Sequence, residues 1–334
     1  MKNCMMIGNK NYLSDFDINE GQLDVKTLAG YQVLKLNNEH LDNAIEVIPG
    51  YGARLNGLWL SDRSVKRNII EGYESDEDLA SDTYYHNAWL FPFVNRLKNG
   101  VYEFEGKDYR FPLNEPDKGN ALHGFLFNQP FEIQDMGVNT EETFIKLRYS
   151  YDGEYDYYPF PFDFQVIYRS NKSNILEVEF FLENTSEHNA PVSFGWHPYL
   201  TFSDDIKNIK VTAPIRERVE VNPNIIPTGS SVKDERFLNG KEIQDDQLDN
   251  SFRLIPTEKY TVALLSQQDR AEITMEFNKS MKFLQMFTPP TRQSIAIEPV
   301  TSNINVFQNG DGLLIIKPGE SFSTIIKIML TQTT

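Results

Sequence analysis

Apolar and polar side chains alternate along several short segments of the chain. In residues 175–182, four apolar side chains occupy every second position with glutamates between them, and only Phe181 departs from the alternation. Because successive side chains of a β-strand point to opposite faces, this pattern predicts a half-buried strand. The same alternation marks residues 143–149, 164–169, 271–277 and 322–328. Residues 101–111 predict a hairpin with a turn over 105–108 that contains Gly106.

Helical signals are few. Residues 75–80 begin with a serine and three acidic residues, which fits either one capped helical turn or a solvated acidic loop. Many short strands separated by turns favour a sandwich or a barrel over alternating strand–helix units. We find no internal repeat and no low-complexity linker, so one domain over residues 1–334 is predicted. Residues 219–249, rich in Asn, Pro, Gly and charge, are predicted to be a surface excursion of the kind that often covers a site.

The charge of the chain excludes several classes of function. There are 32 basic and 48 acidic residues, a formal charge of −16, and such a surface repels nucleic acids and anionic membranes. No segment approaches the roughly 18 apolar residues of a spanning helix, and residues 1–11 lack a signal-peptide pattern. Cys4 is the only cysteine, so an internal disulfide and a thiolate metal cluster are excluded. We therefore expect a cytoplasmic enzyme or binding protein.

Two polar stretches in the first half of the chain lie where a plain sandwich would not need them. Asn95 and Arg96 follow the aromatic run at residues 89–93. A partly buried guanidinium must be paired, so Arg96 either binds a polar ligand or forms a structural salt bridge. His123 precedes Gly124, and glycine permits the close approach or unusual backbone angle that a loop at a site needs.

Two further stretches carry groups able to transfer protons. His197 precedes Pro198, which biases the histidine towards an extended backbone at a strand end. Histidine gives and takes protons near neutral pH, although a buried histidine bonded to the backbone is the commoner role. Glu298 ends the short apolar stretch 295–298, where a carboxylate is costly unless it is paired or functional. Each residue alone fits a structural role as well as a catalytic one.

The order of these stretches resembles the aldose 1-epimerases, the family of the galactose mutarotases. The resemblance covers nearly the whole chain from about residue 30 and rests on five motifs in family order: Asn95-Arg96, Leu122-His123-Gly124, Gly195-Trp196-His197-Pro198-Tyr199, Asp249-Asn250-Ser251-Phe252 and Ile297-Glu298-Pro299. Each motif is weak alone, whereas five in order are a strong signal. The resemblance implies an all-β fold, a large twisted antiparallel β-sandwich (a supersandwich) with the sugar in a cleft on its concave side.

The resemblance also implies a role for each residue. Glu298 is the implied general base that takes the proton of the anomeric hydroxyl, and His197 the implied general acid that protonates the ring oxygen. His123 is expected to stabilise the charge near that oxygen. The implied sugar-binding residues are Arg96, Asp249, Asn95 and Trp196. Two of these leave alternatives open, since Asp245 and Asp246 lie close to Asp249 in the sequence and the ring of Trp196 can equally fill the core.

Proton transfer is the chemistry that such a site would perform. Opening a hexose ring requires O1 to lose a proton while the ring oxygen gains one, and a carboxylate opposite an imidazolium supplies both transfers. We expect an ionised glutamate beside a protonated histidine near neutral pH. We expect no cofactor and no metal, since the sequence has no phosphate-binding glycine loop and no close cluster of metal ligands.

The predicted function is interconversion of the α and β anomers of a free aldohexose of the glucose or galactose type. At a charge of −16 a neutral sugar is favoured over a sugar phosphate. A glycoside hydrolase or lyase would instead use Glu298 and Asp249 as carboxylates about 5 to 10 Å apart, leaving two histidines without a role. A carbohydrate-binding protein without turnover would hold its ligand by aromatic faces and Arg96. For His86 a surface position is favoured over one that reaches the cleft, and the chain is predicted to be a monomer or a homodimer.

Overall fold

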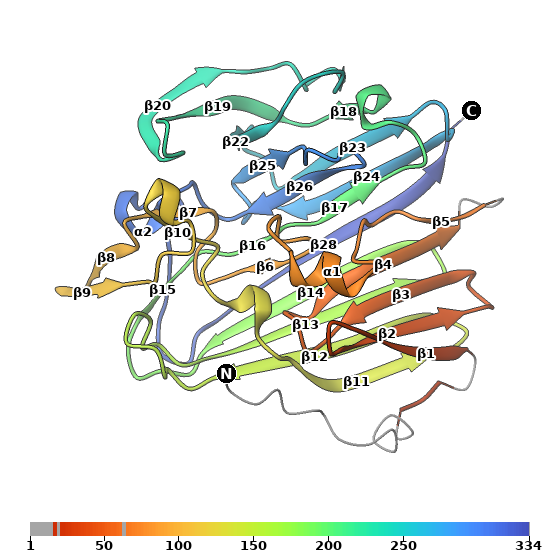
Figure 1. The fold of residues 1–334 in the computed structure, drawn as a ribbon, viewed down its shortest axis with the longest axis horizontal. Helices are drawn as coiled ribbons and strands as arrows, with labels where there is room; N and C mark the ends of the chain where they lie inside the picture. The colour runs from red at the N-terminus through yellow and green to blue at the C-terminus, as the bar shows by residue number, and fades with distance from the viewer. Residues whose placement is uncertain (1–15, 19–20, 62–64, 334) are drawn as a thin grey trace.

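The computed structural model describes residues 16–18, 21–61 and 65–333, and these residues form mainly antiparallel β-sheets (Figure 1). A five-stranded sheet runs in chain order through β1 (Gln22–Leu28), β2 (Tyr31–Asn38), β3 (Asn43–Ile48), β4 (Arg54–Ser61) and β5 (Lys66–Asn68). The prediction of a large antiparallel β-sandwich is confirmed. One domain over residues 1–334 stays a prediction.

The nine-stranded sheet contains the longest strands. In spatial order it runs through β11 (Glu132–Val138), β12 (Glu142–Tyr151), β13 (Phe162–Asn171), β14 (Ile175–Asn184), β28 (Ser321–Gln332), β24 (Ala271–Asn278), β23 (Lys259–Ser266), β18 (Lys210–Thr212) and β21 (Lys241–Glu242). Four of the five strands predicted from alternation lie side by side in this sheet, and the fifth, β24, is next to β28. On β14 the four alternating apolar side chains are buried and Glu179 is exposed, as predicted.

The eight-stranded sheet carries three of the candidate site residues, Glu298, Asp249 and Trp196, and His197 directly follows one of its strands. Its spatial order is β20 (Pro227–Lys233), β19 (Ile215–Val221), β22 (Asp249–Leu254), β25 (Phe283–Phe287), β26 (Ser294–Val300), β16 (Gly195–Trp196) and β6 (Trp89–Leu90), with β17 (Tyr199–Thr201) also paired to β26. In the view of Figure 1, β25 and β26 overlap the long strands β23 and β24 of the nine-stranded sheet. Every residue of β26 is buried, so both faces of this strand are covered.

Small elements complete the fold. Three two-stranded sheets pair β7 (Arg96–Lys98) with β10 (Asn120–Leu122), β8 (Val101–Phe104) with β9 (Lys107–Arg110), and β15 (Ala190–Val192) with β27 (Leu314–Ile316). The helices are α1 (Asp76–Ala80), α2 (Val306–Asn309) and the 3-10 turns η2 (Pro116–Lys118), η3 (Leu126–Asn128) and η4 (Ile206–Asn208). Among the described residues, none of these helices has the length and apolar character needed to span a bilayer.

Three local expectations are refined by the structure. The 75–80 segment is a helical turn, because Ser75 and Asp78 bond each other's backbone in a capping box. The predicted hairpin turns more tightly than expected, over Glu105 and Gly106, both with positive φ. The 219–249 segment is less of a free excursion than expected, since residues 227–233 form β20, the outer strand of the eight-stranded sheet.

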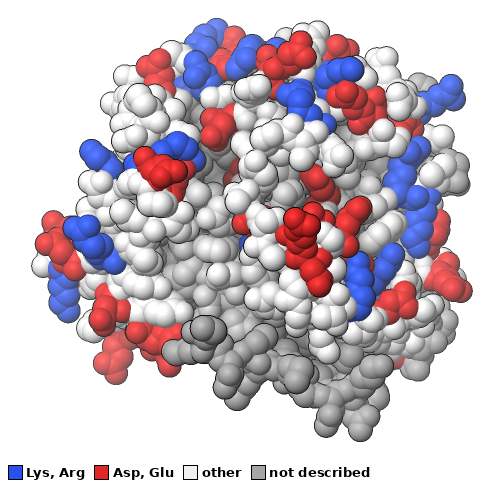
Figure 2. All heavy atoms as spheres, in the orientation of Figure 1, with Lys and Arg blue, Asp and Glu red and all other residues white. Residues whose placement is uncertain are grey.

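Basic and acidic side chains are interspersed over the face drawn in Figure 2, and the described residues there form no extended basic area. Acidic side chains gather where α1 lies, consistent with the three acidic residues of its first turn. That the protein does not bind nucleic acid stays a prediction.

Arg54 is a buried cation that ties β4 to the segment before β6. Its Nη1 donates to Asp82 Oδ2 at 2.6 Å, to the carbonyl of His86 at 3.1 Å and to the hydroxyl of Tyr73. Burial by itself raises the pKa of the Asp82 carboxyl, but its bonds to His86 and Arg54 hold that pKa well below the ordinary value. The pair therefore fixes the position of residues 82–86 relative to the five-stranded sheet.

Replacing Asp82 by asparagine is expected to lower the free energy of unfolding by about 3–5 kcal/mol at pH 7, since it leaves a buried guanidinium without its counter-charge. A carboxyl with a lowered native pKa stabilises the fold above its unfolded pKa of about 3.9, and this contribution is lost as the pH falls. The difference in the free energy of unfolding between wild type and Asp82→Asn should therefore become smaller as the pH falls. Urea unfolding at several pH values measures both effects, with the exposed Asp108→Asn as the control. A loss below about 1 kcal/mol at pH 7 would contradict the expectation.

Candidate active site

Glu298 lies on β26, where residues 294, 296 and 298 share one face of the eight-stranded sheet. Its partner on the neighbouring strand β25 is Gln285, and the partner of Gln285 on the next strand, β22, is Ser251. Directly paired residues point to the same face, so these three side chains form one row across the sheet. The Glu298 side chain is 2% exposed, so its carboxyl is almost fully buried.

His197 follows β16 and is held by its backbone. Its N–H donates to the carbonyl of Ala88 at 3.0 Å, and its carbonyl accepts from the N–H of Asn87 at 3.1 Å. This fixed backbone brings His197 Nε2 to 3.3 Å from Glu298 Oε1. The ring of Tyr199 stacks on the imidazole with a centroid distance of 5.0 Å. His197 Nδ1 is buried and has no hydrogen-bond partner among the described residues.

His123 lies beside His197, with 5.6 Å between the ring centroids. Its Nδ1 accepts from the N–H of Asn95 at 3.2 Å, and its own N–H donates to the Asn95 carbonyl at 2.8 Å. Burial lowers the pKa of His123 well below its ordinary value, and the neighbouring His197 and Arg96 lower it further. The neutral ring therefore carries its proton on Nε2, since Nδ1 is an acceptor. Nε2–H is then a hydrogen-bond donor.

The protonation of the Glu298–His197 pair differs from the sequence-based expectation. Burial lowers the pKa of His197 to about 3. Burial also raises the pKa of Glu298 well above its ordinary value, and the charge of Asp249 raises it further. Both shifts favour the uncharged forms, a protonated glutamate and a neutral imidazole, over the expected ionised glutamate beside an imidazolium. The physical reason is the cost of removing two charges from water.

Arg96 is bound on both sides of its guanidinium. Nε and Nη2 donate to the two carboxylate oxygens of Glu115 at 2.8 and 2.9 Å, and Nη1 donates to Asn95 Oδ1 at 3.1 Å. Burial by itself raises the pKa of Glu115, but its bonds to Arg96 and Asn120 lower it to about 2. The sequence analysis missed Glu115, because nothing distinguishes it from the other acidic residues of the chain. Arg96 thus forms the structural salt bridge that the sequence analysis gave as one alternative. Its Nη1 is not part of that salt bridge and bonds only the side chain of Asn95 among the described residues.

Asp249 begins β22 on the same sheet face as Ser251 and Glu298. Gln285 Nε2 donates to Asp249 Oδ1 at 2.9 Å, while Gln285 Oε1 is buried without a partner among the described residues. A small cavity of about 10 Å³ lies between Gln285, Ser251 and Glu298, room for roughly one water molecule. A polar residue inside the apolar stretch 283–287 was the sequence signal that could have identified Gln285.

The two aspartates that neighbour Asp249 in the sequence lie elsewhere. Asp246 pairs with Lys241 at 2.5 Å, and Asp245 lines a separate large cavity. Trp196 also lies away from the polar group. Its side chain is fully buried, stacked on Trp89 at 5.5 Å, and its Nε1 donates to the carbonyl of Asn87 at 3.2 Å. The structure thus places Trp196 in the core, because it alternates with His197 along an extended segment.

The residues that the structure brings together are Glu298, His197, His123, Asn95, Arg96 and Asp249, joined by Gln285 and Glu115. They come from β26, β22, β7 and the ends of other strands, far apart along the chain. A family model described as aldose 1-epimerase matches residues 33–328. The chain belongs to the aldose 1-epimerase family. At family level the protein is therefore an epimerase or mutarotase that acts on a monosaccharide.

Curated relatives are identical to the chain at about a quarter of the aligned positions. An Escherichia coli protein, "Uncharacterized protein YihR", is 27% identical over 235 residues, which cover 69% of this chain and 74% of that protein. A rat galactose mutarotase is 26% identical over 193 residues, which cover 54% of this chain and 53% of that enzyme. The chain therefore spans about half the length of the mutarotase that it matches.

Solved structures share the fold over almost the whole chain. A galactose mutarotase-like protein from Clostridium acetobutylicum superposes with a TM-score of 0.83 at 20% identity, covering 94% of this chain and 99% of that one. A galactose 1-epimerase from Lactobacillus acidophilus superposes with a TM-score of 0.78 at 16% identity, over 94% of this chain and 99% of that one. At such identities these likenesses establish the fold alone.

Proposed function

We propose that this aldose 1-epimerase family member interconverts the α and β anomers of a free, neutral aldohexose, with Glu298 as general base and His197 as general acid. The observation that carries the proposal is the 3.3 Å contact between Glu298 Oε1 and His197 Nε2. The side chains around this contact are also polar and nearly buried. Two proton-transfer groups with opposite pKa shifts are typical of acid–base sites.

The reaction needs one proton removed and one supplied. Glu298 takes the proton from O1 as the C1–O1 double bond forms, the C1–O5 bond breaks, and His197 gives a proton to O5. Rotation about C1–C2 presents the other face of the carbonyl, and the two transfers then run in reverse. In this proposal the pair shares the single proton that the cycle needs. Moving that proton from Glu298 to His197 would prepare the carboxylate without exchange with solvent.

The surrounding side chains are assigned to sugar binding. His123 Nε2–H is a neutral donor suited to the oxygen on which charge develops, since a neutral donor does not raise the cost of the imidazolium beside it. Asp249 and Gln285 present an acceptor and an unpaired amide oxygen to sugar hydroxyls. Arg96 and Asn95 supply donors, and Glu115 holds the guanidinium in place.

A direct test is to dissolve α-glucose or α-galactose and follow the anomeric proton signals with and without protein. Faster equilibration that depends on protein concentration supports the proposal. Release of reducing ends from oligosaccharides would support a hydrolase instead, and saturable binding without faster equilibration would support a binding protein.

Replacing Arg96 by alanine is expected to raise KM for the hexose about 10- to 100-fold while kcat changes little. A hydrogen bond to a charged group contributes about 1.5–3 kcal/mol, and 1.4 kcal/mol is a factor of ten. Steady-state kinetics on the preferred anomer gives both constants. The exposed Arg110→Ala on β9 is the matched control. An unchanged KM for Arg96→Ala would show that Arg96 serves only its salt bridge to Glu115.

The pH profile is expected to lack the usual histidine titration near pH 6.5. The pair is competent while it holds one proton, and the rate falls when a second proton binds or the last one leaves. Because burial lowers the pKa of His197 to about 3, the second proton binds only in strong acid. Protein-dependent kcat/KM, after subtraction of the buffer-catalysed rate, should therefore stay flat from pH 7 to pH 5. A tenfold fall in kcat/KM between pH 7 and pH 5 would contradict the expected flat profile.

A further inference from the structure

A large cavity bounded by described residues does not contain the Glu298–His197 pair. Its volume is about 1550 Å³, and it lies between the segment 70–86, the loop 201–207 and the loop 289–293. Its nearest link to the strand of the pair is Glu71, a lining residue that accepts a hydrogen bond from Ser294, four residues before Glu298 on β26.

His86 lines this cavity, contrary to the expectation of a surface residue. Its ring is held by a tilted contact with the ring of Tyr199, at a centroid distance of 4.3 Å, and by an edge contact with Tyr73 at 5.5 Å. Its Nδ1 lies 3.4 Å from Asp82 Oδ1, and Asp82 is itself held by the buried Arg54. A side chain supported on so many sides is preorganised, and such support is typical of a binding residue.

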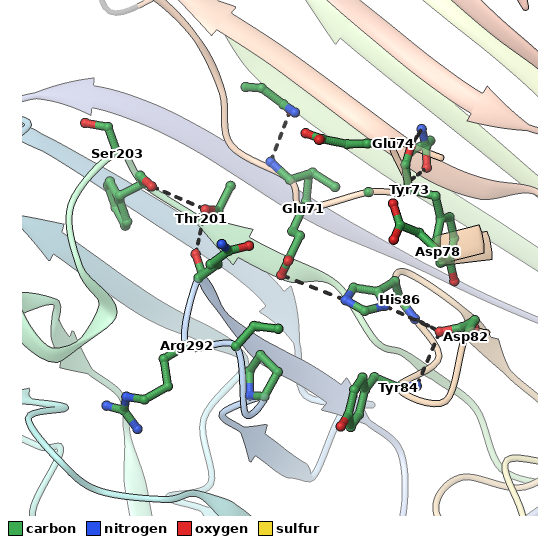
Figure 3. A pocket seen from close by; sticks show the side chains of 18 of the residues that line it. Glu71, Tyr73, Glu74, Asp78, Asp82, Tyr84, His86, Thr201, Ser203 and Arg292 are labelled. Atoms are coloured by element: carbon green, nitrogen blue, oxygen red, sulfur yellow. Dashed lines mark hydrogen bonds and ion pairs between the residues drawn. The ribbon is translucent and has the colours of Figure 1, made fainter. Parts of the chain in front are cut away.

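The free nitrogen of this ring faces a second fixed carboxylate (Figure 3). His86 Nε2 is 3.8 Å from Glu71 Oε2, which is too long for a direct hydrogen bond. The hydroxyl of Ser294 donates to the same Glu71 oxygen and holds it in place. A hydroxyl group placed beside both atoms can donate to Glu71 while it accepts from Nε2–H, or can donate to a neutral Nε2.

The lining of the cavity favours an uncharged ligand. Eight carboxylate side chains and four Lys or Arg side chains line it, so anions are repelled. The described residues contain no group of three or more side chains that could hold a metal ion. Tyr84 adds an aromatic ring at the border of the cavity, stacked on Phe287 at 5.8 Å. Fixed hydrogen-bonding groups beside an aromatic ring suit a polyhydroxylated ligand.

We propose that this cavity is a second carbohydrate site, in which a hydroxyl of a neutral saccharide bridges His86 and Glu71. The site is separate from the catalytic pair, because the ring of Tyr199 lies between His86 and His197 and contacts both. Tyr199 is fully buried, so the two sites are divided by packed protein. The proposal does not depend on turnover at Glu298.

Saccharides without a free anomeric hydroxyl test this site, since they cannot undergo anomer interconversion. Methyl glucoside, methyl galactoside and the non-reducing disaccharide trehalose are titrated against the full-length protein by saturation-transfer NMR. At least one is expected to bind to wild type and to Glu298→Gln with similar affinity. Glu71→Gln is expected to weaken that binding tenfold or more while anomer interconversion changes less than twofold. Ser294→Ala, which frees Glu71, is expected to weaken it to a smaller extent.

The outcomes separate this proposal from the proposed function. Absence of binding by all three saccharides overturns the second site, as does binding that Glu298→Gln abolishes or that neither Glu71→Gln nor Ser294→Ala weakens. Thermal unfolding checks that each variant is folded. If Glu71→Gln does not fold, the binding result for Ser294→Ala decides the test. Failure of anomer interconversion in wild type would overturn the catalytic proposal and leave the binding result standing.

Discussion

Replacing Glu298 by glutamine is expected to reduce kcat for anomer interconversion by about 10²- to 10⁴-fold, the range that a positioned acid–base group contributes. Glutamine keeps the size of the side chain and can still accept a hydrogen bond from His197 or the sugar. It cannot take the proton of the anomeric hydroxyl. The loss should therefore fall on kcat, with KM changed only a few-fold.

The measurement is the protein-dependent rate of anomer exchange by NMR, with the spontaneous rate subtracted. Glu179→Gln is the matched control, because Glu179 is an exposed strand residue on β14 and should leave the rate unchanged. Removing the buried carboxyl also removes a group whose pKa burial has raised, so the variant should fold at least as stably as wild type. A rate within tenfold of wild type would show that Glu298 is not the base.

Replacing His197 by asparagine is expected to cost a similar factor of about 10²–10⁴ in kcat. Asparagine can donate a hydrogen bond to the ring oxygen but cannot transfer a proton to it. The ring nitrogen Nδ1 has no partner among the described residues, so the substitution breaks few structural bonds. The main structural loss is the stacking on Tyr199.

The double variant tests whether the two residues act as one unit. Because a single proton passes between them, Glu298→Gln with His197→Asn should be little slower than either single variant. The exposed His188→Asn serves as the control. Losses that multiply in the double variant would mean that the two side chains act in independent steps, and the shared-proton cycle would then be wrong.

The strands and one helical turn were predictable because their causes are local. Alternation along β14 and the capping box at Ser75 depend on residues within a few positions of one another. The motif order identified the family, and the structure places His197 and Glu298 in contact although 101 positions separate them in the numbering of the chain. Neither motif by itself indicates how close the two side chains lie in the fold.

Other features could not be predicted, because they depend on partners distant in the sequence. Glu115 becomes the partner of Arg96 only when the loop after β9 folds back over β7. Trp196 faces the core because of how β16 lies against β6, where Trp89 covers its ring. His86 lines a cavity because Arg54, on another sheet, holds Asp82 beside it.

The sequence by itself determined the class of fold and the chemical types of the site residues, since strand periodicity and side-chain chemistry are properties of short segments. Tertiary structure decided which of those residues meet, how deeply they are buried and so in which direction their pKa values shift. Burial acts through the whole surrounding protein, and it raises the pKa of Glu298 while it lowers that of His197, against the expectation from isolated side chains.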